Sequence, residues 1–378
     1  MIKKLYKFFK RILLVLISLI LLLIISGLIW HETSPQFGGE ISELKNIKYK
    51  KTGHYKDGIF INKTTVNMDM PALKMVSIMI DFIKGNPNGQ PNQNIDVLKI
   101  DSTTIAKNKL INQITWFGHS AILLELDENK ILIDPMLSNV PSPLPILGPE
   151  RYSKELPITI DKLPFIDAVI ISHDHYDHLD YESIQKLKKK VNHFYVPLGV
   201  DAHLIEWGID TSKITALDWW ETAKVNEVDL VFTPSRHFSG RGLGDRFSTL
   251  WGSWVLKGKK DNIFFSGDGG YGPHFKEIGD KHGPFDFSMI ECGQYNKNWA
   301  DIHMMPEESV QAAKDLKSSI MMPIHWGAFT LSLHDWTDPI ERVIKAANDL
   351  EIPISTPMIG QPFNWKTEVI ISTWWTKY

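Results

Sequence analysis

The chain has 378 residues, a formal net charge of −3 and a hydrophobic content of 43%, which is typical of a globular protein with a sizeable core. Its lysines and arginines form no basic stripe that could neutralise phosphates, so we expect no nucleic-acid partner. The single cysteine, Cys292, excludes an intramolecular disulfide framework and a cysteine-based zinc cluster.

The N-terminus carries an uncharged apolar run from Ile12 to Trp30, long enough to span a bilayer as a helix. Basic residues precede it, namely Lys3, Lys4, Lys7, Lys10 and Arg11. The following segment, "HETSPQFGGEISE", has neither lysine nor arginine. The positive-inside rule therefore predicts a cytoplasmic stub and single-pass membrane anchor over residues 1–30, with the catalytic domain in the periplasm or at the cell surface. A cleaved signal peptide is the alternative, although "ISGLIW" lacks a small-x-small cleavage site.

Residues 31–95 are predicted to be a linker and an amphipathic extension. The polar, glycine-bearing part up to residue 65 indicates a tether or a surface-laid segment. The stretch 71–85, "PALKMVSIMIDFIKG", predicts a helix with a broad apolar face. Such a helix either packs on the domain or contacts a membrane, and both interpretations stay open. The flexible "NPNGQPNQN" then precedes the third region, residues 96–378.

Short apolar runs alternate with turns and helical patterns from residue 97 onward. The segment 121–135 predicts a β-hairpin that turns at residues 127–129. Further strands are predicted at 167–172, 192–197, 229–235, 248–256, 262–268 and 320–325, and helices at 181–190 and 306–317. The second helix has Pro306 at a suitable first position, followed by two glutamates. Strands and helices interleave, which indicates a mixed α/β class.

The stretch "VIISHDHYDHLD" places clustered histidines and aspartates directly after an apolar strand. In an extended segment alternate residues point the same way, so His173, His175 and Asp177 can converge, with His178 next to them. Imidazole and carboxylate suit zinc or a similar divalent ion, and iron or manganese would also accept them. Four such groups exceed the needs of one open catalytic ion and suggest two ions in one site.

Other predicted strands end in residues that can bind the same metals. These residues are His237 in "VFTPSRHFSG", Asp268 in "IFFSGDGGYG" and His325 in "MMPIHWG". Each adjoins small or turn-forming residues, as expected where strand ends surround an active site. A single buried histidine or aspartate is more often structural, but seven together would be too costly to bury without a metal.

The run formed by His173, His175, Asp177 and His178 resembles the H-x-H-x-D-H signature of metallo-β-lactamase-fold hydrolases. The resemblance implies a four-layer αββα sandwich with a dimetal site at one edge. It also implies that one zinc is held by His173, His175, His237 and Asp268, and the other by Asp177, His178, His325 and the bridging Asp268. Asp134, in "ILIDP", matches the acidic residue that orients such sites from behind the ligands.

An ordered set of motifs over about residues 110–330 looks like the N-acyl-phosphatidylethanolamine phospholipase D branch. The motifs include "TWFGHSAILLEL", "LDWWE", "VFTPSRHFSGR", "LWGSWV", "FFSGDGGYG" and "IHWGAF". By this resemblance His303 lies near the substrate, where it orients the phosphate or protonates the leaving group; a packing role is the alternative. The implied catalytic residues are then Asp134, Asp177, Asp268 and His303.

The resemblance implies hydrolysis of N-acyl-phosphatidylethanolamine to phosphatidic acid and an N-acylethanolamine. The predicted anchor independently favours a membrane phospholipid as substrate and the bilayer as partner. Animal members of this branch look like peripheral proteins on the cytosolic side, so the predicted topology puts the natural lipid in question. The alternatives are a dimetal hydrolase of a lactone or soluble phosphodiester, and a non-catalytic metal-binding membrane protein. A homodimer is compatible with the sequence.

Overall fold

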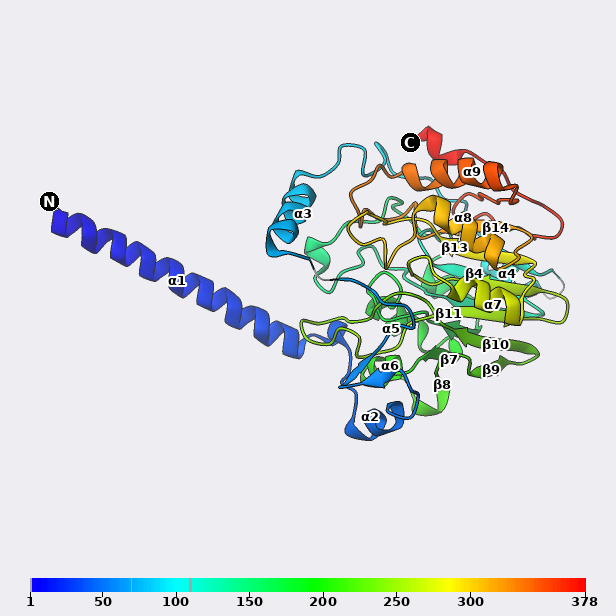
Figure 1. The fold of residues 1–378 in the computed structure, drawn as a ribbon, viewed down its shortest axis with the longest axis horizontal. Coiled ribbons are helices and arrows are strands. Elements are labelled where there is room, and N and C mark those ends of the chain that lie inside the picture. Colours follow the sequence, from blue (N-terminus) through cyan, green and yellow to red (C-terminus); the bar gives the residue numbers. More distant parts are fainter. Residues whose placement is uncertain (1, 69, 109–110) are drawn as a thin grey trace.

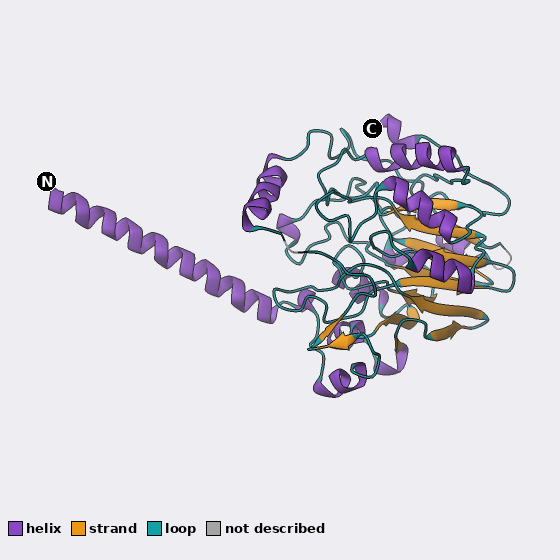
Figure 2. Cartoon of the chain, in the orientation of Figure 1, coloured by secondary structure: helices purple, strands orange, loops and turns teal. Residues whose placement is uncertain are grey.

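A computed structural model describes residues 2–68, 70–108 and 111–378. Figure 1 shows a long N-terminal helix, α1 (Ile2–Thr33), projecting from a domain of two stacked sheets. Helices lie on the outside of both sheets, as the colouring by secondary structure makes clear (Figure 2). The mixed sheets agree with the predicted sandwich.

The first sheet has six strands in the order β3-β4-β5-β6-β7-β8. The pairs β3/β4 and β4/β5 are antiparallel, whereas β5 to β8 run parallel. The strands are β3 (Gln113–Trp116), β4 (Ile122–Leu126), β5 (Asn129–Ile133), β6 (Ile166–Ile170), β7 (Val191–Pro197) and β8 (Ile214–Leu217).

The second sheet also has six strands, in the order β14-β13-β12-β11-β10-β9. The pairs β14/β13 and β13/β12 are parallel and the remaining pairs antiparallel. The strands are β9 (Thr222–Val225), β10 (Val228–Thr233), β11 (Ser253–Lys257), β12 (Asn262–Phe265), β13 (Phe287–Glu291) and β14 (Met321–Ile324).

Alternate residues of the first sheet serve two hydrophobic cores, as the period-two geometry of a strand requires. Ile122 and Leu124 of β4 join the core between the sheets, whereas Leu123 joins a second core beneath the outer helices. Those helices are α4 (Ser102–Lys107), α5 (Tyr181–Leu187) and α6 (Val200–Glu206). The outer face of the second sheet is covered by α7 (His274–His282), α8 (Pro306–Asp315) and α9 (Asp338–Leu350).

Most predicted elements are present with shorter bounds. The hairpin turns where Asp127 and Glu128 both have positive φ, at 48° and 68°, as a two-residue turn requires. The strand predicted at 248–256 begins only at Ser253, which pairs with Thr233 of β10. The strand β13 was not predicted from the sequence, although it is paired on both sides, between β14 and β12.

The segment between α1 and α3 lies against the domain. It contains α2 (Glu43–Tyr49), β1 (Tyr55–Lys56) and β2 (Ile59–Phe60), and Tyr49, Tyr55 and Phe60 belong to the main core. Its start is held by a hydrogen bond from Trp207 Nε1 to the Pro35 carbonyl at 2.7 Å. This part is therefore a surface-laid segment and not a free tether.

Two apolar helices are not buried in the domain. The helix α1 is long and apolar enough to cross a membrane, and none of its residues is buried; a membrane anchor and a signal sequence share these features. The helix α3 (Ala72–Lys84) has no buried residue either. The interpretation of α3 as a helix packed on the domain is therefore wrong for most of its surface.

Candidate metal centre and catalytic site

The predicted ligands meet at one edge of the sandwich because the strands that precede them end there. Asp134 follows β5 and His173 follows β6 in the first sheet, while Asp268 follows β12 and His325 follows β14 in the second. Since parallel strands share one carboxyl edge, residues distant in sequence become neighbours. His237 reaches the same place from the loop after β10.

One group of ligand atoms comes from three histidines, His173, His175 and His237, and lies within 4.8 Å. The His173 Nε2 to His175 Nδ1 distance is 2.9 Å and the His237 Nε2 to His175 Nδ1 distance is 3.2 Å. The far nitrogens of two of these rings are occupied by Ser172 Oγ and the Ile302 carbonyl. The remaining nitrogens therefore face one another. Three facing lone pairs repel unless a cation lies between them, so the arrangement suits a shared metal ion.

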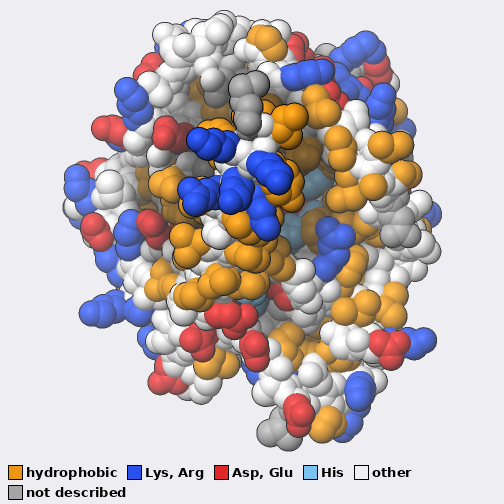
Figure 3. Space-filling model, turned by 90° about the vertical axis from the view of Figure 1, so that its left-hand side faces the viewer, with side chains coloured by type: hydrophobic (Ala, Val, Ile, Leu, Met, Phe, Trp, Pro, Cys, Tyr) orange, Lys and Arg blue, Asp and Glu red, His pale blue; other side chains and the backbone are white. Residues whose placement is uncertain are grey.

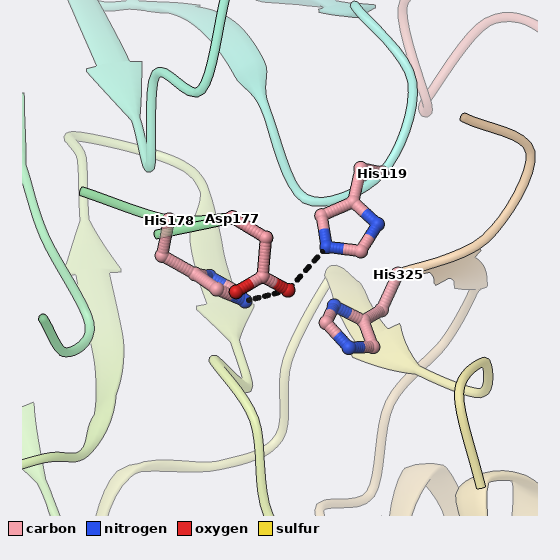
Figure 4. Close-up of side chains that lie close together, drawn as sticks. All are labelled: His119, Asp177, His178 and His325. Carbon is pink, nitrogen blue, oxygen red and sulfur yellow. Dashed lines mark hydrogen bonds and ion pairs between the residues drawn. The ribbon is translucent and has the colours of Figure 1, made fainter. Parts of the chain in front are cut away.

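A second group combines His119, Asp177, His178 and His325 (Figure 4). Asp177 Oδ2 lies 2.8 Å from His119 Nε2 and 3.6 Å from His178 Nε2. Figure 4 shows His119 on the loop after β3 and His325 beyond β14, next to each other on one side of the carboxylate, with His178 on the other side; the His119 and His325 ring centroids are 4.1 Å apart. Three of these four residues were predicted as ligands, and His119 was not.

Asp268 lies between the two groups. Its carboxylate oxygens are 3.1 Å from His178 Nε2 and 3.2 Å from His325 Nδ1 on one side. On the other side they are 3.8 Å from His173 Nε2 and 3.9 Å from His237 Nε2. The Asp268 carboxylate is thus within 4 Å of histidine nitrogens from both groups.

The donor set fits metal ions on two further observations. Asp268 Oδ1 and His178 Nε2 are buried and make no hydrogen bond to any described residue, although each faces a potential ligand atom of the site at 3.1–3.2 Å, so a cation between these atoms would satisfy them. Burial lowers the pKa of His173 and His237 well below the ordinary value, and the neighbouring histidines lower it further. These rings are therefore neutral, which is the form that binds a metal.

Asp134 contacts the predicted ligand His178 directly and the predicted ligand His173 through Ser172. It accepts hydrogen bonds from the Ser172 amide at 2.7 Å and from Ser172 Oγ at 2.5 Å, and it lies 2.7 Å from His178 Nδ1. Its φ of 40° places it in the left-handed region, as do the φ values of 55° at His119 and 66° at His325. Strained backbone of this kind concentrates at functional sites.

Asp174 belongs to the same run but points away from the ligands. It accepts hydrogen bonds from the Gly240 amide and Thr249 Oγ1, at 2.8 and 2.7 Å. Arg241 Nη1 donates to the Asp174 and Leu179 carbonyls, at 2.5 and 2.8 Å. In the extended part of the run, His173 and His175 therefore face the site and Asp174 faces the scaffold, whereas the turn that follows brings both Asp177 and His178 into the site.

His303 lies beside both ligand groups and has a partner that the sequence analysis missed. Its Nδ1 is 2.9 Å from Glu291 Oε2, and Glu291 Oε1 accepts from the Gly269 amide at 2.8 Å. Burial lowers the pKa of His303, but the Glu291 carboxylate outweighs it and raises the pKa to about 9. Burial raises the pKa of Glu291 itself to about 7, so the two buried groups share a proton between His303 Nδ1 and Glu291 Oε2. A packing role alone would not require this pair.

The ligands form the floor of a cleft of about 540 Å³. The floor residues that line it include His175, Asp177, Asp268, His303 and His325. Its walls are largely apolar and include Met68, Met70, Met75, Phe82, Phe238, Trp299 and Leu331. Figure 3 looks onto this face: hydrophobic side chains surround a hollow in which histidines are visible.

Two missed residues, His119 and Glu291, had weak signals in the sequence. His119 stands in "WFGHSA", directly after a strand, and Glu291 ends the apolar run "FSMIE". Two tryptophans in the quoted motifs "LDWWE" and "LWGSWV" have structural roles. Trp254 Nε1 donates to the Ile171 carbonyl and Trp219 Nε1 to the Trp251 carbonyl, so they fix the strands on which the site is built.

Comparison with known proteins agrees with this geometry. Residues 129–326 match the family model described as the β-lactamase superfamily domain. An uncharacterized protein of Mycobacterium tuberculosis is 37% identical over 91% of this chain and 93% of its own length. The N-acyl-phosphatidylethanolamine-hydrolyzing phospholipase D 1 of Caenorhabditis elegans is 32% identical over 63% of this chain and 71% of its own. A solved isothiocyanate hydrolase from Delia radicum gut bacteria has a TM-score of 0.53 at 21% identity, covering 66% of this chain and 98% of its own.

Proposed function

Because this chain belongs to the β-lactamase superfamily of metal-dependent hydrolases, we propose that it cleaves the phosphodiester of N-acyl-phosphatidylethanolamine. The products are phosphatidic acid and an N-acylethanolamine. The proposal is carried by one observation: an apolar-walled cleft ends at a floor of imidazoles and carboxylates. Such a cleft suits a molecule with long acyl chains and a reactive anionic group.

We assign the floor to two zinc ions, with iron or manganese as alternatives. One ion would be held by His173, His175, His237 and Asp268, and the other by Asp177, His178, His325 and Asp268. Bound there, a metal pair supplies an activated water and neutralises the phosphate oxygens during in-line displacement. Asp134 keeps the ligand rings oriented through Ser172 and His178.

The side chains around the floor bind and orient the substrate. A water oxygen adds to phosphorus, the bond from phosphorus to the ethanolamine oxygen breaks, and that oxygen needs a proton. The His303 imidazolium lines the cleft and is placed to donate it, with Glu291 stabilising the charged ring. Arg246 also lines the cleft and can attract the anionic phosphate.

The proposed membrane arrangement is supported by the length and apolar composition of the first helix. We assign residues 1–30 to a cytoplasmic stub and membrane anchor, residues 31–95 to an extension, and residues 96–378 to the hydrolase domain on the extracytoplasmic side. An anchor would hold the cleft where lipid substrate is concentrated. The helix α1 ends at Thr33, and Trp207 already binds the carbonyl of Pro35, two residues further along the chain. The domain therefore lies close to the end of α1.

The test uses zinc-loaded full-length protein in detergent, offered N-acyl-phosphatidylethanolamine and plain phosphatidylethanolamine separately. Mass spectrometry should detect an N-acylethanolamine and phosphatidic acid from the first lipid. No cleavage of either lipid by protein shown to contain metal would contradict the proposal. The alternative would then be a hydrolase of a lactone or soluble phosphodiester.

A further inference from the structure

The strongest unexplained surface is the outward side of α3. Its residues Leu73 and Ile83 are 85% and 78% exposed, values that leave nearly the whole side chain in water. Val76, Met79 and Ile80 are also exposed. A contiguous apolar surface of this kind marks an interaction site on a folded protein.

The sequence of α3 gives it an unusually wide apolar arc. At 100° per residue, its polar side chains fall into one narrow strip made of Lys74, Ser77, Asp81 and Lys84. The rest of the circumference is apolar. An ordinary surface helix would need only its domain-facing stripe to be apolar, so the outward apolar side chains require another environment.

The inner side of α3 is continuous with the cleft. Met75 and Phe82 line the cleft, and the Phe82 ring stacks on Trp299 with centroids 6.4 Å apart and planes at 12°. The same helix therefore forms part of the cleft mouth and carries the exposed apolar side chains. Whatever covers the outer side of α3 also lies at the entrance to the site.

The position of α1 identifies the occupant. Figure 1 shows α1 and α3 on the same side of the domain, and Figure 3 shows that this side carries the hollow with hydrophobic side chains around it. The end of α1 is fixed to the domain, since Trp207 Nε1 donates to Pro35 and Arg241 Nε donates to the Gln36 carbonyl at 2.9 Å. A bilayer entered by α1 would thus lie next to α3.

We propose that α3 is an interfacial helix that inserts its outward apolar side chains into the same bilayer that α1 enters. The cleft mouth then opens directly onto lipid, and a phospholipid can pass into the cleft without crossing water. Lys74 and Lys84 would remain at the head-group level. The inference shares the membrane setting of the proposed function, but it concerns where α3 lies and not which bond is cut.

The experiment places a fluorescent label on α3 and on a matched position. Ile83→Cys and Ile371→Cys change the same residue type at 78% and 76% exposure, and native Cys292 is buried and inaccessible to the label. Each full-length variant is labelled with a polarity-sensitive dye. It is then reconstituted at one chain per nanodisc of plain phosphatidylcholine containing spin-labelled lipids.

The label at position 83 should shift to the blue and be quenched several-fold more strongly than the label at position 371. Equal quenching at the two positions, or failure of the full chain to stay with the discs, would overturn the proposal. Protection at position 83 only in discs with two chains would replace the bilayer with a second copy. Since phosphatidylcholine serves only as the membrane, the result stands even if N-acyl-phosphatidylethanolamine is not the substrate.

Discussion

The floor and the mouth of the cleft are built on opposite physical principles. The floor consists of buried titratable groups that follow strand ends, such as Asp268, which is 3% exposed and lies 3.1 Å from His178 Nε2. The mouth consists of apolar side chains on α3, a helix without a buried residue. Charge is buried where chemistry needs it, and apolar surface is exposed where a lipid would cover it. The contrast indicates a reaction site that is fixed and an entrance that depends on its surroundings.

The largest effect is expected from Asp268→Asn at the floor. Removing the shared carboxylate weakens both ligand groups, so turnover should fall by more than the ~10–100-fold typical of residues behind a ligand. Metal content per chain should fall with it, as measured by elemental mass spectrometry. Asp229→Asn, at an exposed carboxylate of β10 that pairs with Lys224, is the matched control. Full activity of Asp268→Asn would contradict the bridging role.

The next largest effect is expected from His303→Gln. Losing a proton donor should lower turnover by about 10²–10⁴-fold while leaving bound metal unchanged. The turnover of the variant and of the unchanged protein is compared in a stopped assay at equal metal content per chain. His193→Gln, at a histidine that contacts Thr215 in the first sheet, should have no such effect. Loss of metal from the His303→Gln variant would instead indicate that His303 is a metal ligand.

Glu291→Gln should have a smaller effect, about 10–100-fold on turnover, because it acts through His303. Burial lowers the pKa of His303 and the Glu291 charge raises it, so removing that charge should lower it. A donor works below its pKa, and the alkaline limb of the pH–rate profile should therefore move to lower pH. The matched control is Glu125→Gln. Glu125 is also a buried glutamate, but it accepts hydrogen bonds from the side-chain amides of Asn108 and Gln113 and not from His303, so this change should leave the pH–rate profile in place. An unmoved alkaline limb in Glu291→Gln would separate Glu291 from proton transfer.

The smallest effect is expected at the mouth, from Ile83→Ser. Partial insertion of one such side chain is worth about 1 kcal/mol, or roughly fivefold in apparent KM on vesicles. Turnover of the same lipid dispersed in detergent should not change, because the floor is intact. The matched control is Ile371→Ser. Equal loss on vesicles and in detergent would indicate a folding defect and remove the distinction between mouth and floor.

The predicted ligands came together because local pattern and sheet geometry agree. Each of His173, His237 and His325 follows an apolar run, and such runs become strands whose ends meet at one edge. Glu291 was missed because β13 was not predicted. The sequence of this strand, "FSMIE", is short, and a serine interrupts its apolar residues. His119 was missed because its contact with Asp177 crosses from one strand loop to another, and no spacing encodes that distance.

By itself, the sequence determined the apolar first helix, the metal-binding composition of the site and the two-faced strands that form the cores, since each depends on residue type and local periodicity. Only the tertiary structure decided that Asp268 lies between the two ligand groups, that Glu291 pairs with His303, and that α3 stands at the cleft mouth with its apolar side outward. The reason is that these relations depend on how separate strands and loops pack in space. That packing is set by the whole core and not by any one segment.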